Sequence, residues 1–195
     1  MRGLVAFIVL APAIAAADDR LIDADTFAVT SQGTLGLDAG MLVAAPAALP
    51  SGISSGIVAG VTRECGCHLA YGVRAAWSTT TQTSEVWTVT HWDMRVHAIG
   101  SLRYEAGRGS VALRLGLGPT FVRESRLRNQ AMREGRTDLD TRAWGTVPAG
   151  ELEAVFAVHV TGPWLAVASG GPAFDYFGGS VKVGWLATLG VAWQP

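Results

Sequence analysis

The last stretch of the chain, Ser180 to Trp193, reads S-V-K-V-G-W-L-A-T-L-G-V-A-W and alternates between two kinds of side chain. The odd positions are bulky and apolar apart from one alanine: Val181, Val183, Trp185, Ala187, Leu189, Val191 and Trp193. The even positions are mostly small or polar. A period of two residues predicts a β-strand. Fourteen residues exceed the soluble strand of about 5–6 and suit a tilted membrane-crossing strand of about 9–11. The stretch therefore predicts the closing strand of a transmembrane β-barrel.

The composition is consistent with such a barrel. Of 195 residues, 49% are apolar and 16% are charged, with 24 Gly and 7 Trp. Beyond the N-terminus no run of about 18 apolar residues is present to form a membrane helix. Hydrophobicity spread along alternating strands is what a membrane barrel requires, because half of each strand faces lipid. The net charge of −1 gives no indication of nucleic-acid binding. A soluble, glycine-rich β-domain is the alternative.

The N-terminus has the three parts of a secretory signal peptide. Met1-Arg2 is a short positive start, Leu4–Leu10 is apolar, and Ala15–Ala17 supplies small residues before Asp18. We predict a signal peptide over residues 1–17, a periplasmic lead-in over 18–33 and the barrel over 34–195. Within the lead-in, Thr26–Thr30 alternates weakly and is either an additional strand or an extension of the first. The protein is thus expected to cross the inner membrane.

Turn residues divide the rest of the chain into eight alternating segments. They are Thr34–Val43, Gly56–Arg63, His68–Ser78, Val86–Tyr104, Ser110–Arg123, Val147–Val160, Trp164–Phe174 and Ser180–Trp193. An even number is typical of bacterial outer-membrane barrels. Longer connections are expected at Ala44–Ser55, Thr79–Glu85, Glu124–Thr146 and Asp175–Gly179, and they alternate with tight ones. With both termini in the periplasm, the tight turns are periplasmic and the longer loops lie outside. The predicted fold is all-β, an eight-stranded antiparallel up-and-down transmembrane barrel.

The two faces indicate which side of each strand points outward. The small face is mostly Gly, Ala, Ser and Thr with single charges, which suits the narrow interior of an eight-stranded barrel. A solvated exterior carries many more charges. Aromatic residues fall near strand ends, as in the girdles of membrane barrels: Trp77, Phe121 and Phe174 at one end, and Tyr104, Trp164 and Trp193 at the other.

In strand count, loop asymmetry and final strand, residues 34–193 resemble the small eight-stranded outer-membrane barrels of the OmpA/OmpX-like class. The resemblance implies an outer-membrane location in a Gram-negative envelope, a monomer and no cofactor. It also implies outer-membrane lipid and the barrel-assembly machinery as partners. Barrels of this class usually end on an aromatic residue that the machinery reads. Val191 and Trp193 fit that pattern in part, but Gln194-Pro195 follow.

Charged and histidine side chains recur on the inward face. Their predicted positions are Asp38, Arg74, Asp93, Arg95, His97, Arg103, Arg114, Glu151, Glu153, His159 and Lys182. Buried charges persist only when paired, so this set predicts salt bridges that plug the lumen. Neighbouring strands would pair Arg114 with Glu151 or Glu153, and Lys182 with Asp38 across the closing seam. A narrow polar pore is the alternative.

Cys65 and Cys67 lie in a predicted periplasmic turn, where oxidation favours a strained local disulfide. Two cysteines and His68 fall short of the four ligands of a structural zinc site, so no metal is expected. The segment Glu124–Arg142 carries five arginines and four acidic residues. It is interpreted as a solvated outer loop, or as a contact for lipopolysaccharide phosphates, which arginine binds well.

Two stretches offer residues for catalysis, His91-Trp92-Asp93 and His159-Val160-Thr161. Outer-membrane lipid A deacylases are eight-stranded and use a lipid-facing His and Ser with an acid. Here His159 is predicted to face the lumen and Thr161 replaces the serine, so no enzyme is predicted. The leading hypothesis is a small barrel with a structural or surface-interaction role. The competing hypotheses are a soluble periplasmic lipocalin-like binding protein, a lipid A-modifying enzyme and a narrow pore.

Overall fold

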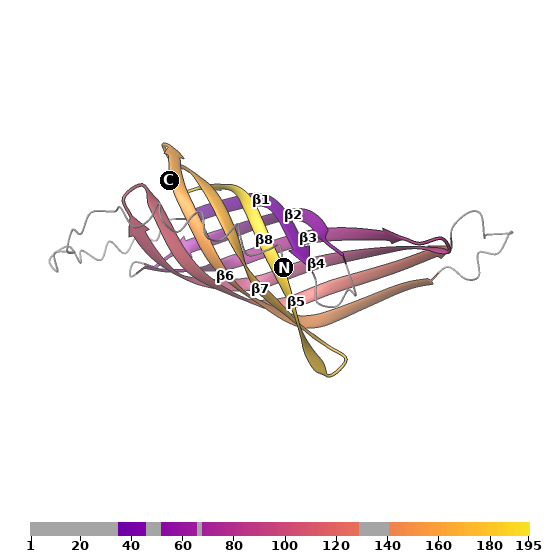
Figure 1. Cartoon of the computed structure of the whole chain (residues 1–195). Coiled ribbons are helices and arrows are strands. Elements are labelled where there is room, and N and C mark those ends of the chain that lie inside the picture. Colours follow the sequence, from indigo (N-terminus) through magenta and orange to yellow (C-terminus); the bar gives the residue numbers. More distant parts are fainter. Residues whose placement is uncertain (1–34, 46–51, 66–67, 129–140) are drawn as a thin grey trace, which may run out of the picture.

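The structure, a computed structural model, describes residues 35–45, 52–65, 68–128 and 141–195. The strands are β1 (Leu35–Ala45), β2 (Ser54–Glu64), β3 (Leu69–Thr83), β4 (Trp87–Ala106), β5 (Gly109–Arg128), β6 (Thr141–Thr161), β7 (Trp164–Phe177) and β8 (Ser180–Trp193). Each pairs antiparallel with the next, and β8 pairs with β1, so the sheet closes into a barrel (Figure 1). The predicted eight-stranded antiparallel barrel is confirmed, and β8 has the predicted bounds.

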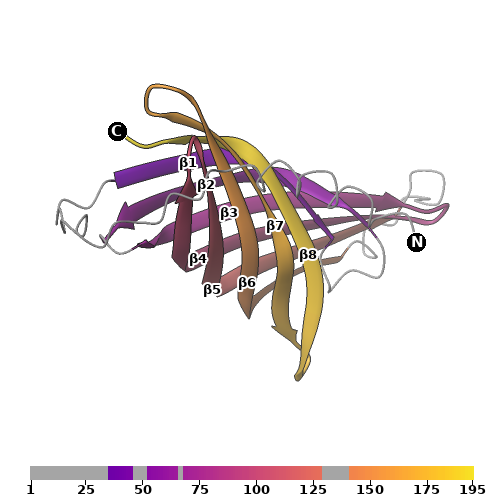
Figure 2. The ribbon, with the colours of Figure 1, turned by 60° about the vertical axis from the view of Figure 1, so that its left-hand side comes forward.

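The barrel has two distinct ends (Figure 2). At the end where β1 begins and β8 finishes, here called the turn end, β4 joins β5 and β6 joins β7 through two-residue turns. Gly107 and Gly162 occupy the first position of these turns with φ of +59° and +52°, a conformation that glycine adopts without strain. The opposite end, here called the loop end, carries the β1–β2, β3–β4, β5–β6 and β7–β8 connections.

Several loop-end connections are shorter than predicted, because the strands run further. The predicted loop Thr79–Glu85 is mostly strand, and Asp175–Gly179 reduces to a turn at Gly178-Gly179. The predicted loop Glu124–Thr146 is also wrong at both ends, since β5 continues to Arg128 and β6 begins at Thr141. The β3–β4 hairpin and the ends of β5 and β6 project past the rest of the barrel, on the right of Figure 1. In these polar ends the strands stay hydrogen-bonded to their neighbours. Apolar residues no longer recur at every second position, which is the pattern that marks a membrane strand.

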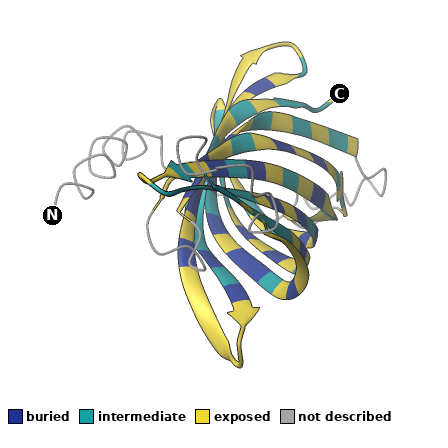
Figure 3. Cartoon of the chain, turned by 90° about the vertical axis from the view of Figure 1, so that its right-hand side faces the viewer, coloured by how far each residue is buried: buried dark blue, intermediate teal, exposed yellow. Residues whose placement is uncertain are grey.

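Burial alternates along each strand, as Figure 3 shows. Large apolar side chains on the outer wall are widely exposed, such as Met41 and Leu189 at 70% and Trp185 at 63%. The buried set instead contains many charged and hydroxyl side chains. A soluble lipocalin-like barrel would place its bulky residues inward. That alternative is therefore wrong for this chain.

An apolar cluster fills the lumen on the loop-end side of its middle. Leu42 and Ala44 of β1 pack there with Ala173 of β7 and Leu186 of β8, all at most 4% exposed. The register supports this grouping, since Ala44 lies opposite Leu186 across the seam.

No described segment forms a helix with the length and hydropathy that a membrane crossing needs. The predicted signal peptide (1–17), the lead-in (18–33) and the weak segment Thr26–Thr30 all lie outside the described residues.

Candidate functional site

A network of paired charges crosses the middle of the barrel interior. Both carboxylate oxygens of Glu153 (β6), which is fully buried, accept hydrogen bonds from Arg74 Nη1 (β3) at 2.7 Å. Arg114 Nη1 (β5) lies 3.3 Å from Glu153 Oε2, one of the two pairings expected from the strand order. Ser169 Oγ (β7) donates to the same oxygen at 3.2 Å. The four side chains come from four strands, so they fill the lumen rather than line one wall.

Glu151 extends this network toward β4. Its Oε2 lies 3.3 Å from Nδ1 of His97, which is 1% exposed, and its Oε1 lies 3.3 Å from Arg74 Nη1. Arg74 also donates from Nη2 to Thr188 Oγ1 on β8 at 3.4 Å. Removing one partner of a buried ion pair leaves the other charge desolvated and uncompensated. The structure places both acids and both arginines where each has an opposite charge.

Nearer the loop end, Arg95 Nη2 lies 3.5 Å from Asp175 Oδ2, and Asp93 is buried on the same face of β4. Asp175 is a lumen residue that the sequence analysis missed, because it was assigned to a loop. β7 runs to Phe177, so Asp175 continues the buried face of Ala173. Extending the alternation by one step would have found it.

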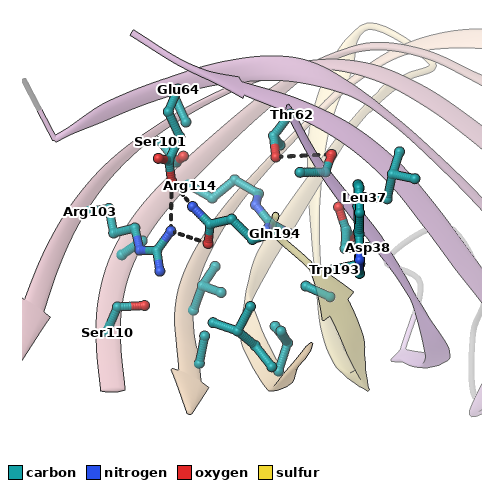
Figure 4. A pocket seen from close by; sticks show the side chains of 18 residues that line it. Leu37, Asp38, Thr62, Glu64, Ser101, Arg103, Ser110, Arg114, Trp193 and Gln194 are labelled. Carbon is teal, nitrogen blue, oxygen red and sulfur yellow. Dashed lines mark hydrogen bonds and ion pairs between the residues drawn. The ribbon is translucent and has the colours of Figure 1, made fainter. Parts of the chain in front are cut away.

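Three polar side chains are joined by hydrogen bonds at the turn end (Figure 4). Arg103 Nη1 donates to Glu64 Oε1 at 2.7 Å and to Gln194 Oε1 at 2.9 Å, while Gln194 Nε2 donates to Glu64 Oε1 at 2.6 Å. The backbone N–H of Gln194 donates to Pro163 O at 2.8 Å. Residues after the final aromatic therefore latch β8 onto β2 and β4. Glu64 was missed because the second strand was predicted to stop at Arg63.

A small cavity lies beside this latch, lined by Asp38, Ser101, Arg103 and Arg114 among others (Figure 4). Its volume is about 90 Å³. Ligand and cofactor sites usually measure about 300–1,000 Å³, so the cavity suits water rather than an organic ligand. In the described part of the chain, no group of three or more His, Cys, Asp or Glu side chains has an arrangement that could hold a metal ion.

Lys182 and His159, which belong to the predicted charge set, are both exposed and lie outside the buried network. Lys182 is exposed near the β7–β8 turn, opposite Asp175, whereas Asp38 pairs with Ala192 at the other end of β8. The predicted Lys182–Asp38 pair is wrong, because alternation gives the facing of a strand but not its register. His159 is exposed at the turn-end rim, beside a register shift between His159 and Thr161, and so lies outside the buried network.

The two candidate catalytic stretches lie at opposite ends of the barrel. His91 Nε2 lies 3.2 Å from Glu124 Oε2, on the inward-facing side of β4 and β5 near the loop end. Thr161 is paired with Trp164 next to the β6–β7 turn, at the turn end with His159. His91 and His159 therefore belong to different ends of the barrel and do not form one site.

Cys65 directly follows β2, and its Sγ donates to Leu69 O at 3.3 Å. Cys67 lies outside the described residues, so the Cys65–Cys67 disulfide stays a prediction.

Comparison with solved structures identifies the fold. Ail of Yersinia pestis, in complex with the heparin analogue sucrose octasulfate, matches with a TM-score of 0.52 over 83% of this chain and 97% of that chain. Neisserial surface protein A matches with a TM-score of 0.51 over 85% and 98%. The chain has the fold of the small eight-stranded outer-membrane β-barrels. The resemblance seen in the sequence is thus confirmed at the level of the fold.

The sequence itself has little identity to these barrels. Identity to the two outer-membrane barrels is 9% and 15%. No family model matches the chain, and no curated protein matches it. The shared fold accounts for the exposed apolar wall, while the lumen pairs and the turn-end latch are argued from this chain alone.

Proposed function

We propose that the protein is an outer-membrane barrel that remains closed and contacts molecules at the cell surface through its loop end. The observation that carries the proposal is the inverted distribution of polarity. The outer wall exposes large apolar side chains around the whole barrel, while Arg74, Arg114, Glu151 and Glu153 are buried inside it. Such a wall is favourable against lipid and unfavourable against water. The turn end is then periplasmic and the loop end external.

The charge network supports a structural rather than a conducting interior. An eight-stranded barrel is just wide enough for its own side chains. Arg74 reaches partners on β6 and β8, which spans the lumen. The apolar cluster around Leu42 and Leu186 and the latch at Gln194 close it at two further levels.

Contact with surface polyanions is the finer part of the proposal. The solved Ail structure holds a sulfated sugar analogue. In the present chain, residues 129–140 include Arg133 and Arg136, and Arg142 is exposed at the start of β6. Arginine forks bind sulfate and phosphate oxygens in pairs, which supports this loop end as the contact surface.

Cell fractionation tests the location. The protein is expected in the outer-membrane fraction, with gel mobility that changes on heating because the folded barrel resists detergent. Trypsin added to intact cells is expected to cut within Glu124–Thr146, while the turn at Gly107-Arg108 stays intact until the cells are opened. Recovery of the protein in the soluble periplasm without detergent would contradict the proposal.

A further inference from the structure

An arginine lies between two tryptophan rings on the outer wall near the loop end. The strand register places Trp92 of β4 beside Arg123 of β5, and Arg123 beside Trp144 of β6. The Arg123 Cζ lies 5.2 Å from the Trp92 ring centroid and 4.7 Å from that of Trp144. Both distances are within the range of cation–π contact. We call these three residues the Trp–Arg–Trp cluster.

Outward-facing residues that are paired across neighbouring strands form rows around the barrel. The two rows next to this cluster differ in polarity. On the barrel side, the next outward row places Trp77 beside Met94 and Met94 beside Phe121. Trp77 packs edge-on against Trp92, with ring centroids 6.0 Å apart. On the loop side, the next row is polar and consists of Thr81, Thr90, Ser125 and Arg142. The cluster therefore marks the border between the apolar wall and the polar projecting hairpins.

A groove of about 570 Å³ lies over the cluster, lined by its three members and by Trp77, Met94 and Phe121, with Asp93, Gly145 and Thr146 completing the lining. That volume is within the range of ligand sites. Trp144 is 72% exposed, and exposing so large an aromatic ring to water is unfavourable. The groove is open on the side where lipid meets the wall.

The charge of Arg123 is not balanced by any described residue. Its Nε is buried and has no hydrogen-bond partner in the described part of the chain. Nearby on the same strand, Arg126 is paired with Glu124 on the opposite face. Cation–π contact with two indole rings holds the Arg123 guanidinium at the wall, and its terminal Nη atoms form no hydrogen bond within the described part of the chain. Two such N–H donors match the oxygens of a phosphate.

We propose that the Trp–Arg–Trp cluster binds the phosphate of an outer-leaflet glycolipid, whose acyl chains lie along the apolar row of Trp77, Met94 and Phe121. The inference rests on the proposed outer-membrane location. The site is on the wall and not in the lumen, and aromatic rings border its one cation. Those features fit an amphiphile better than a soluble anion, which would gain nothing from the apolar row.

Lipid A binding to the refolded full-length protein tests the proposal. Native mass spectrometry in a neutral detergent would measure the apparent Kd for diphosphorylated lipid A. Arg123→Gln is expected to weaken binding about tenfold or more, since charge-assisted hydrogen bonds to phosphate are lost. Trp144→Ala is expected to weaken it several-fold by removing one stacking face, an interaction of about 0.5–2 kcal/mol.

Two matched controls separate the site from general effects of charge and aromatic area. Arg126→Gln removes the same charge from the other face of β5, and Trp185→Ala removes an exposed tryptophan from β8. Both are expected to bind lipid A as the wild type does. Heat-modifiable mobility of each variant shows that it has folded.

Two further ligands distinguish the sources of phosphate. Dephosphorylated lipid A is expected to bind about tenfold or more weakly, and millimolar inorganic phosphate is expected not to compete. Wild-type affinity in Arg123→Gln would overturn the proposal. An equal loss of lipid A affinity in Arg126→Gln would overturn it too. Competition by inorganic phosphate would also overturn it, because the site would then bind a soluble anion. Because binding is measured in micelles, it can succeed or fail independently of where the protein fractionates in cells.

Discussion

Three side chains from three other strands converge on the carboxylate of Glu153. Arg74 donates to both oxygens at 2.7 Å, and Arg114 and Ser169 contact Oε2 at 3.3 and 3.2 Å. The carboxylate thus compensates two buried cations at once. Its removal leaves Arg114 without an ion-pair partner among the described residues and leaves Arg74 with only the longer contact to Glu151. Lumen stability is therefore expected to depend strongly on Glu153.

We expect Glu153→Gln to lower the free energy of unfolding by about 3–5 kcal/mol, the cost of breaking a buried pair. Urea unfolding in micelles, followed by tryptophan fluorescence, measures it. Glu105→Gln is the control, because Glu105 also forms an ion pair, with Arg103 at 3.5 Å, but its side chain is 67% exposed. An exposed pair contributes less than about 1 kcal/mol. Equal losses in the two variants would show that the lumen network does not stabilise the barrel.

Individual residues also show where prediction from sequence ends. Alternation predicted the inward facing of Arg74, His97 and Glu153 because the facing of a side chain follows from parity along one strand. Ion pairs depend on register between strands, which the alternation does not contain. That is why Lys182 was matched with Asp38 although the two lie at opposite ends of the seam.

At the scale of elements, small inward residues let neighbouring strands approach closely. A methyl group at Gly72 of β3 would overlap the carbonyl oxygen of Val61 on β2, whereas one at Gly100 of β4 would meet nothing within 4 Å. Gly72 is thus required by the contact between β2 and β3, and Gly100 is not. The narrow barrel depends on such positions because its strands curve tightly around a small lumen.

We expect Gly72→Ala to destabilise the barrel by about 1–3 kcal/mol through overpacking. Gly100→Ala, on the outer face of the adjoining strand, is expected to be neutral or stabilising by up to about 1 kcal/mol, since alanine loses less backbone entropy on folding. Urea unfolding and refolding yield in micelles measure both. A smaller loss for Gly72→Ala than for Gly100→Ala would mean that strands β2 and β3 can separate without cost.

The predicted bounds of β8 were accurate, whereas the other strands depart from their predicted bounds, mostly at the loop end. β8 keeps its predicted bounds because every residue lies in the alternating wall. The segment Glu124–Thr146 was predicted as a loop because its charges hide the period of two. Its outer parts are nevertheless strand, held by ladder pairing between β5 and β6. Trp144 of the Trp–Arg–Trp cluster was missed for the same reason.

At the scale of the whole molecule, side chains meet across the lumen at three successive levels. The latch of Glu64, Arg103 and Gln194 lies at the turn end, the network around Glu153 lies in the middle, and the cluster of Leu42 and Leu186 lies beyond it toward the loop end. Each level uses side chains from opposite walls. A path for ions would need the middle and apolar levels to open together, whereas the latch side chains Arg103 and Glu64 are already partly exposed, at 18% and 32%.

We therefore expect the wild-type protein to be silent in planar lipid bilayers. Arg74→Ser with Glu153→Ser removes the middle level without changing net charge, and Leu42→Ser with Leu186→Ser removes the apolar level. Each pair alone is expected to remain silent, because the other level still fills the lumen. The fourfold variant, checked for folding by heat-modifiable mobility, is expected to show small conductance steps through the remaining polar latch. Steps from the wild type would contradict a closed barrel, and steps from either pair alone would show that the levels do not act in series.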